Sequence, residues 1–247
     1  MASVEEGRAI YPSLRGKKVL VTGGGSGIGA GIVEGFAGQG SDVTFFDICE
    51  ESEALAGRTG ACFVRVDLHD IPATTAAIAE LGTVDVLVNN AANDDRHAIA
   101  DVTEDYWDDR LSVNLKLQFF CAQAVAPAMR AQGRGAIVNL GSISWHLALP
   151  ELVLYQTCKA AIEGLTRALA RDLGKDNIRV TCVVPGNVQT PRQMQWYTPE
   201  GEAEIVAAQC LKGRLVPEDV AALTMFLASA DARLITGHEY FVDAGWR

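Results

Sequence analysis

Short apolar runs alternate with longer stretches of helical periodicity along most of the chain. Several runs are almost wholly apolar, which is typical of strands that are covered on both faces. The expected strands are 18–22, 42–47, 61–66, 84–88, 135–140, 178–184 and 239–242. The expected helices are 28–39, 71–81, 103–131, 153–174 and 217–229. This alternation predicts an α/β fold with a parallel sheet and helices on both of its faces.

The segment 187–213 breaks the alternation. It has no strand pattern, and a polar and aromatic stretch is followed by a short amphipathic helix near 202–211. Ligands of open α/β sheets bind beyond the carboxyl ends of the strands, where long excursions often serve as lids. No linker rich in Pro, Ser or charge divides the chain. We therefore predict one domain, 1–247, with a substrate lid at 187–213; a surface insertion or a subunit contact is the alternative.

Charge and composition restrict the partners. The chain carries 31 Asp and Glu against 21 Lys and Arg, a net charge of −10. This acidity argues against nucleic acid and against an anionic membrane surface as partners. Neither a signal peptide at residues 1–8 nor an apolar run of about 18 residues is present. We therefore expect a cytoplasmic protein that does not bind a membrane.

Cysteine and histidine spacing argues against a metal site. The six cysteines contain no C-x-x-C pair, and the four histidines are widely separated. In a reducing compartment the cysteines are expected to be free thiols that pack as small apolar groups.

A glycine-rich segment follows the first strand directly. Residues 22–29 read Thr-Gly-Gly-Gly-Ser-Gly-Ile-Gly, so the spacing is G-x-x-x-G-x-G instead of the commoner G-x-G-x-x-G. Gly23, Gly27 and Gly29 allow a tight turn and a close approach to a pyrophosphate, and a helix beginning near Ile28 aims its free N–H groups at phosphate. A plain turn is the alternative, but the strand before and the helix after favour a dinucleotide.

Asp47, at the end of the next expected strand, predicts which dinucleotide binds. It follows Gly29 by eighteen residues, close to the interval expected for a ribose-binding carboxylate. A carboxylate there accepts hydrogen bonds from ribose hydroxyls and repels a 2′-phosphate, so we predict NAD over NADP. Asp67 and Leu68 are placed to meet the adenine, and 89–92 lies near the switch point of the sheet. Ordinary strand-end turns are the alternative for these two segments.

Tyr155 and Lys159 are spaced i and i+4, so they share one face of the expected helix 153–174. A free tyrosine has a pKa of about 10, and a nearby ammonium together with a positive nicotinamide ring favours the phenolate. Ser142 can hydrogen-bond the reacting oxygen, and Asn114 can bind a water that leads from Lys159 toward solvent. This spacing also occurs by chance on solvated helices, but here Ser142 and the glycine-rich segment accompany it.

Together these residues resemble the short-chain dehydrogenase/reductase family over almost the whole chain. The matching segments are Thr22–Gly29, Asp67, Asn89–Ala91, Asn114, Ser142, Tyr155, Lys159 and Pro185–Gly186. The resemblance implies a doubly wound, Rossmann-type sheet of seven parallel strands and a homotetramer. Ala92 departs from the family, which usually has glycine there; its methyl is expected to crowd the turn only slightly.

The same resemblance implies a role for each reacting group. Tyr155 is implied as general acid and base, and Lys159 as the group that holds the nicotinamide ribose and lowers the pKa of the tyrosine. Ser142 is implied to position the substrate oxygen, and Asn114 to hold the water of a proton relay. The expected cofactor-binding residues are Gly23, Ser26, Gly27, Ile28, Gly29, Asp47, Ile48, Asp67, Leu68, Asn90, Ala91, Tyr155, Lys159, Pro185, Gly186 and Val188.

Four further segments are similar to those of bacterial NAD-dependent D-xylose 1-dehydrogenases and related aldose dehydrogenases: 93–97, 141–146, 196–201 and 243–247. This resemblance implies oxidation of an aldose, a pentose such as D-xylose or L-arabinose, at C1 to the aldonolactone. Many hydrogen-bonding groups and flat aromatic faces suit a sugar ring. The expected substrate-binding residues are Asn93, Asp94, Ser142, Ser144, His146, Tyr155, Asn187 and Trp196, with Trp145, Gln156 and Gln193 as further candidates.

Other functions stay open at this point. The chain could act on another sugar or on a sugar-acid derivative, or reduce a 3-oxoacyl thioester. Asp47 and the acidic composition disfavour the thioester reductase, which usually needs NADPH and a basic patch. A non-catalytic NAD sensor is a more remote alternative, because it is expected to have lost the serine, the tyrosine or the lysine.

Overall fold

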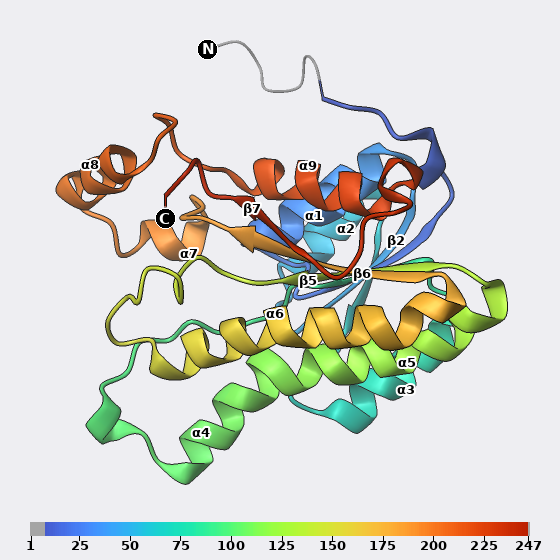
Figure 1. The fold of residues 1–247 in the computed structure, drawn as a ribbon, viewed down its shortest axis with the longest axis horizontal. Helices are drawn as coiled ribbons and strands as arrows, with labels where there is room; N and C mark the ends of the chain where they lie inside the picture. Colours follow the sequence, from blue (N-terminus) through green and yellow to red (C-terminus); the bar gives the residue numbers. More distant parts are fainter. Residues whose placement is uncertain (1–7, 247) are drawn as a thin grey trace.

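A parallel sheet of seven strands runs through the centre of the protein in the order β3-β2-β1-β4-β5-β6-β7 (Figure 1). The computed structural model describes residues 8–246; most of the segment in which no signal peptide was expected, and Arg247, lie outside this range. The strands are β1 Lys18–Thr22, β2 Asp42–Asp47, β3 Cys62–Arg65, β4 Val86–Asn89, β5 Gly135–Leu140, β6 Ile178–Pro185 and β7 Glu239–Val242. The predicted doubly wound α/β fold is confirmed.

Helices cover both faces of the sheet, with α1, α2 and α9 on one face and α3, α5 and α6 on the other (Figure 1). The helices are α1 Gly27–Gly38, α2 Ser52–Thr59, α3 Ile71–Leu81, α4 Glu104–Leu111, α5 Leu117–Gln132, α6 Val153–Leu173, α7 Pro191–Met194, α8 Pro199–Ala208 and α9 Pro217–Ala228. No helix within residues 8–246 combines the length and the apolar character needed to cross a membrane.

Helices α2, α4 and α5 differ from the sequence pattern. Helix α2 was not predicted, because its eight residues bury only Ser52 and Leu55 and therefore carry almost no periodic apolar signal. The expected helix 103–131 is divided into α4 and α5 by a π-helical turn, Ser112–Lys116. Such turns are rare in helices and frequently lie at functional sites.

The core consists of two layers, one on each face of the sheet. Val19 and Val21 of β1 pack with Phe36 of α1 in one layer. Leu20, between them, packs with Leu117 of α5 in the other layer. Successive side chains of a strand point to opposite faces. The doubly covered sheet therefore explains why its strands are almost continuously apolar.

The carboxyl ends of the strands share one edge of the sheet, where the order reverses between β1 and β4. Helices α7 and α8, at the left of Figure 1, extend from this edge. A parallel bridge between Val188 and Leu215 joins the two ends of the excursion, and Gln189 N–H donates to the Leu215 carbonyl at 2.8 Å. The segment 187–213 is thus a closed excursion beside the edge where ligands of such folds bind.

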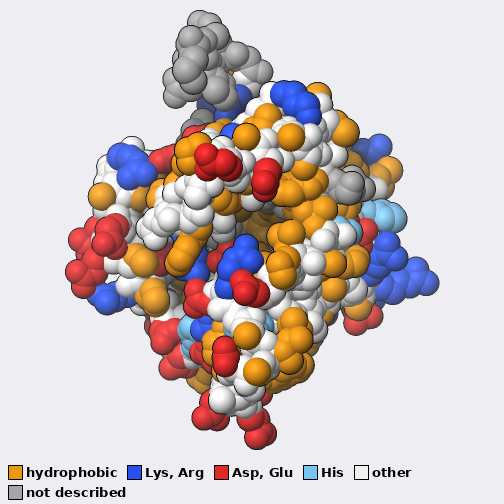
Figure 2. Space-filling model, turned by 90° about the vertical axis from the view of Figure 1, so that its left-hand side faces the viewer, with side chains coloured by type: hydrophobic (Ala, Val, Ile, Leu, Met, Phe, Trp, Pro, Cys, Tyr) orange, Lys and Arg blue, Asp and Glu red, His pale blue; other side chains and the backbone are white. Residues whose placement is uncertain are grey.

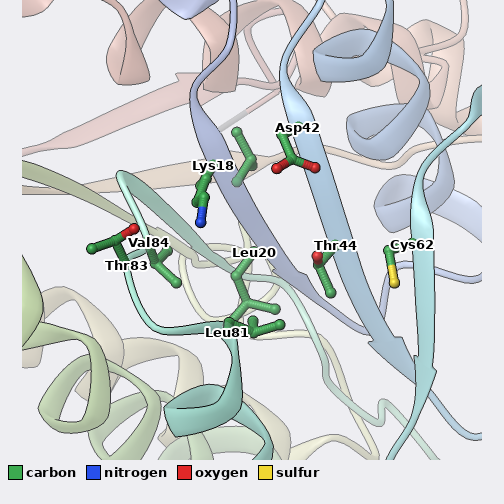
Figure 3. A pocket seen from close by; sticks show the side chains of 9 residues that line it. Lys18, Leu20, Asp42, Thr44, Cys62, Leu81, Thr83 and Val84 are labelled. Atoms are coloured by element: carbon green, nitrogen blue, oxygen red, sulfur yellow. The ribbon is translucent and has the colours of Figure 1, made fainter.

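A cavity of about 290 Å³ lies at the opposite edge of the sheet (Figure 3). Its lining includes Lys18, Asp42 and Cys62, which begin β1, β2 and β3, and also Thr83 and Val84. None of the predicted site residues lines it. The cavity is therefore separate from the candidate site described below.

Candidate active site

The glycine-rich turn after β1 is shaped by close backbone contacts. Gly23 has φ +63°, and a Cβ on it would lie 2.8 Å from the Cα of Ala91. A Cβ on Gly29 would lie 2.0 Å from the Gly23 carbonyl oxygen. The Ser26 side chain makes no capping hydrogen bond to α1. The first turn of α1 therefore has N–H groups without a side-chain cap, next to a loop that only glycine can form, which fits a phosphate group.

Asp47 is held beside this turn. Its Oδ2 accepts from the Gly25 N–H at 2.8 Å, and its Oδ1 accepts from the N–H groups of Ile48 at 2.8 Å and Cys49 at 3.1 Å. The carboxylate of the predicted ribose-binding residue is thus fixed at the end of β2 and adjoins the glycine-rich turn.

The loops after β1 and β4 are tied together by side chains. Asn90 Nδ2 donates to the Gly23 carbonyl at 2.7 Å and to the Thr22 carbonyl at 3.1 Å. The Thr22 hydroxyl in turn accepts from the N–H groups of Asn90 at 3.1 Å and Ala91 at 3.2 Å. The structure therefore brings Asn90 and Ala91 to the glycine-rich turn. Ala92, which departs from the family pattern, is exposed.

The other expected cofactor residues lie at the ends of β3 and β6. Asp67 Oδ1 accepts from the His69 backbone N–H at 3.0 Å, and Leu68 is buried. At the end of β6, the Gly186 N–H donates to the Val242 carbonyl at 2.9 Å, and Val188 is buried.

Lys159 is a buried cation on α6. Its side chain is only 2% exposed, and Nζ donates to the Leu140 carbonyl at 2.7 Å. Nζ also lies 5.4 Å from the centre of the Tyr155 ring. Burial lowers the pKa of Lys159 to about 8. The predicted pairing of ammonium and phenol on one face of the helix is present.

The surroundings of Tyr155 within the protein raise the pKa of its phenol above the ordinary value. Burial raises it most, and the carboxylate of Asp94 raises it further, whereas a hydrogen bond with Ser142 and the guanidinium of Arg192 lower it. The predicted downward shift assumed the Lys159 ammonium and a positive nicotinamide ring beside the phenol. Of these two cations, the protein itself supplies only the ammonium. Burial of the phenol outweighs the lowering contributions that the protein makes by itself.

Asn114 lies in the π-helical turn and is completely buried. Its Oδ1 accepts from the Asn93 N–H at 2.8 Å, and its Nδ2 donates to the Asn93 carbonyl at 3.0 Å. The amide predicted to hold a water thus holds the backbone of the loop after β4. This contact, between residues 21 positions apart, has no local sequence signal.

Asp94 connects this loop to the segment 187–213. Its carboxylate accepts from Arg192 Nε at 2.9 Å and from Gln193 Nε2 at 2.7 Å. Arg192 also pairs with Asp95, which in turn accepts from Arg110 Nη1 at 3.1 Å. Acidic and basic side chains lie close together on this face of the molecule (Figure 2). Sequence reasoning missed Arg192 and Arg110, because nothing in the local sequence indicates their contacts with Asp94 and Asp95, which lie almost 100 residues from Arg192 and 15 residues from Arg110.

Two further polar groups lie near the site. Asn187 Oδ1 accepts from the hydroxyl of Tyr197 and from Arg214 Nη2 at 2.9 Å. Ser142 Oγ accepts from the Ser144 N–H at 3.1 Å. The Ser144 hydroxyl is itself buried and finds no hydrogen-bond partner within residues 8–246. A polar substrate can supply such a partner.

Trp145, His146 and Trp196 make no described hydrogen bond to this cluster. Trp145 Nε1 and His146 Nε2 lie 2.9 Å and 3.1 Å from Glu163 Oε1. Glu163 is eight residues after Tyr155, about 12 Å farther along α6. The Trp196 side chain is 76% exposed. The structure thus brings Asp94 and Ser142 to Tyr155, whereas His146 is held by Glu163 and Trp196 is exposed.

Metal ligands do not gather in this region. Across residues 8–246, no three or more His, Cys, Asp or Glu side chains form a group that could hold a metal ion. All six cysteines are free thiols, and Cys121, Cys158 and Cys182 are buried.

Comparison with known proteins extends this description. A family model described as enoyl-(acyl carrier protein) reductase matches residues 23–247. The chain is 65% identical over 245 residues to a D-xylose 1-dehydrogenase of Caulobacter vibrioides, covering 97% of this chain and 99% of that protein. It is 49% identical to a probable galactose dehydrogenase of Rhizobium meliloti, with 95% and 96% covered.

Solved structures agree with these relatives. A short chain dehydrogenase/reductase family protein superposes with a TM-score of 0.86 at 33% identity, covering 94% of this chain and 98% of that chain. A 3-oxoacyl-[acyl-carrier protein] reductase from Brucella melitensis superposes with a TM-score of 0.87 at 31% identity, with 96% and 93% covered.

The buried ammonium predicts a pH-dependent contribution to stability. Folding lowers the pKa of Lys159 from 10.5 to about 8, so the folded state binds this proton more weakly than the unfolded state. The ammonium therefore destabilises the fold below pH 8, and this effect disappears as the pH rises toward 10.5. Relative to Lys159→Met, the wild type should gain about 1 kcal/mol in free energy of unfolding between about pH 7 and 9.

Urea unfolding at the two pH values measures this difference. Lys175→Met is the control, because Lys175 is exposed and its removal should leave the difference from wild type independent of pH. An equally constant difference for Lys159→Met would show that the lysine does not resist protonation in the folded state.

Proposed function

The chain belongs to the short-chain dehydrogenase/reductase family, and on this basis we propose that it is an NAD-dependent aldose 1-dehydrogenase. It is an oxidoreductase that acts on a CH–OH group with a nicotinamide cofactor. The proposed reaction oxidises a cyclic aldose, a pentose such as D-xylose or L-arabinose, at C1 to the aldonolactone. The observation that carries the proposal is the cluster of Ser142, Tyr155 and Lys159, in a chain 65% identical to a D-xylose 1-dehydrogenase.

In this reaction Tyr155 acts as the base. Its phenolic oxygen removes the proton of the C1 hydroxyl, and Ser142, which hydrogen-bonds the phenol, orients the same hydroxyl. The glycine-rich turn and Asp47 would hold the cofactor, and its nicotinamide ring would supply the acceptor for the hydride from C1. The Lys159 ammonium stabilises the phenolate electrostatically from below the tyrosine ring. The Leu140 carbonyl holds Nζ in place, so this charge is positioned before substrate arrives.

Polar groups around Tyr155 suit a sugar better than an acyl chain. Asn93, Asp94, Ser144 and Asn187 offer donors and acceptors that ring hydroxyls can use. Of the expected substrate-binding residues, His146 is held by Glu163, and Trp196 is exposed on the lid. We therefore place the first four residues, together with Ser142 and Tyr155, around the sugar. A 3-oxoacyl thioester reductase remains the second candidate, because a solved structure with that description superposes closely.

The lid is the segment 187–213. In the present structure Arg192 joins it to Asp94 and Asp95 through partly exposed ion pairs. Such pairs contribute at most about 1 kcal/mol each, so the lid can open for substrate and close over it. Assembly as a homotetramer and a cytoplasmic location stay predictions from the family resemblance.

Substrate identity is tested by following NADH formation from NAD⁺ with candidate substrates. We expect the highest kcat/KM for an aldose among D-xylose, L-arabinose, D-galactose, a sugar acid and a 3-hydroxyacyl thioester. Tyr155→Phe should lower kcat by about a hundredfold or more and leave NADH affinity nearly unchanged. Tyr11→Phe is the control, because Tyr11 packs against Phe226 on α9, outside the site. Substantial turnover by Tyr155→Phe would refute the role of the phenol as base.

Cofactor choice is tested at Asp47. Removing a carboxylate that accepts from ribose hydroxyls should lower kcat/KM for NAD⁺ by about ten- to a hundredfold and raise activity with NADP⁺. Steady-state kinetics of Asp47→Ala with both cofactors measures the change. Asp42→Ala, at the other end of β2, is the control and should preserve the preference. A wild type that prefers NADP⁺, or a variant that gains no NADP⁺ activity, would contradict the assignment.

The lid contact is tested with Arg192→Ala. We expect KM for the aldose to rise about fivefold, since the lost ion pairs are partly exposed, while the affinity for NAD⁺ stays constant. Arg58→Ala, which breaks a similarly exposed pair with Glu34, is the control. An unchanged KM in Arg192→Ala would show that the contact of Arg192 with Asp94 and Asp95 does not contribute to lid closure.

A further inference from the structure

The helix that carries Tyr155 begins without a cap from its own residues. Leu152 occupies the N-cap position of α6, and its apolar side chain makes no capping hydrogen bond. The first N–H groups of a helix have no partner within the helix. An acceptor from elsewhere in the chain is therefore needed near Leu154, the residue directly before Tyr155.

His97 supplies this acceptor from the loop after β4. Its Nε2 lies 3.3 Å from the Leu154 N–H, which donates to it. Its Nδ1 lies 3.2 Å from the carbonyl oxygen of Asp95, an acceptor only, so Nδ1 carries the proton. Both contacts together require the neutral imidazole with Nε2 unprotonated. The ring thus acts as a remote cap for α6 over a sequence separation of 57 residues.

Two hydrogen bonds to backbone carbonyls hold Arg96 and His97 against the start of α6. The His97 N–H donates to the Glu151 carbonyl at 2.9 Å, and Arg96 Nη1 donates to the Pro150 carbonyl at 3.1 Å. The same loop is held at its other end by Asn114, through Asn93. The loop that presents Asp94 is therefore joined directly to the turn that presents Tyr155.

The ionisable groups around the ring come from four elements. From α4, the Tyr106 hydroxyl lies 3.5 Å from Nδ1, and Arg110 stacks over the Tyr106 ring. Asp95, on the same loop, directs its carboxylate to Arg110 and to Arg192 of the lid helix α7. Arg96 lies on the loop, and its described hydrogen bond goes to the Pro150 carbonyl. Glu151 lies before α6, and its described hydrogen bond is made by its backbone carbonyl.

We propose that His97 is a positioning residue for Tyr155, and that its neutral form is required to cap α6. This inference rests on the proposed function only in that Tyr155 acts as the base. A protonated imidazole has no acceptor nitrogen, and its positive charge is unfavourable at the positive end of the helix dipole. Histidine changes charge between about pH 5 and 8. Protonation therefore releases the first turn of α6 and the loop that carries Asp94, and lowers activity at acidic pH.

Two substitutions of His97 separate the effect of the hydrogen-bond acceptor from the effect of the positive charge on the imidazole. In His97→Gln the amide oxygen can accept from Leu154 at every pH, so kcat/KM at about pH 7.5 should stay within about threefold of wild type. In this variant kcat/KM should fall less at acidic pH than in wild type, because only the protonation of Tyr155 then lowers it. In His97→Ala the acceptor is lost at every pH, and kcat/KM should fall about five- to tenfold while the affinity for NAD⁺ is unchanged.

His238→Gln is the matched control. His238 is exposed, and its described hydrogen bond is a backbone contact from the Cys182 N–H, so its pH profile should follow that of wild type. A profile of His97→Gln that parallels wild type over the whole acidic range would overturn the proposal. Full kcat/KM in His97→Ala would overturn it as well.

Amide hydrogen exchange of residues 153–157 gives a readout that needs no substrate. In wild type, protection of this segment, corrected for intrinsic rates, should be lower at about pH 5.5 than at about pH 7.5. His97→Gln should keep its protection at both pH values, and His97→Ala should lack it at both. Equal protection in His97→Ala and wild type would refute the cap. If no aldose is oxidised, the proposed function fails, yet this measurement still decides the role of His97.

Discussion

The ammonium of Lys159 inside the protein is the constraint on which the site depends. A buried charge is unfavourable unless polar groups compensate it, and here the compensating hydrogen bond comes from the Leu140 carbonyl at the end of β5. The observed arrangement of α6 and β5 allows this bond and also places Nζ 5.4 Å from the centre of the Tyr155 ring. The register between one helix and one strand end is therefore coupled directly to the reacting group.

Burial acts on both members of this pair in the direction of their neutral forms. It lowers the pKa of Lys159 and raises that of Tyr155. Neither shift by itself makes the phenol a base at neutral pH. Additional positive charge near the ring favours the phenolate. The protein's own groups therefore favour the neutral phenol, and further positive charge beside the ring is needed to form the phenolate.

Side-chain bonds to backbone hold the fixed part of the site together. Thr22 and Asn90 join the loops after β1 and β4, and Asn114 fixes Asn93. These donors and acceptors are largely buried, where a broken hydrogen bond leaves an unsatisfied group. The contacts of Arg192 with Asp94 and Asp95 are more exposed and correspondingly weaker. The contacts around the glycine-rich turn are therefore largely buried, whereas those between the loop after β4 and the segment 187–213 are partly exposed.

The features that could be predicted from the sequence are those with a local signal. The sheet, the glycine-rich turn, Asp47 and the pairing of Tyr155 with Lys159 all have local signals, because strand periodicity, glycine spacing and i, i+4 spacing act over a few residues. Helix α2 is too short and too polar to show periodicity, and the π-helical turn at Ser112–Lys116 interrupts a pattern that reads as one helix. The upward shift of the Tyr155 pKa depends on burial, which periodicity does not measure.

Contacts between remote segments account for the rest. His146 has the residue type expected for a sugar site, yet Glu163 of α6 holds its ring. Arg192 meets Asp94 across almost 100 residues, and His97 meets Leu154 across 57. The contacts of Arg192 and His97 lie between the loop after β4, the start of α6 and the segment 187–213, whereas the contact of His146 lies farther along α6. Local motifs thus determine the class of reaction, whereas the choice of substrate depends on loops whose relative placement only the fold determines.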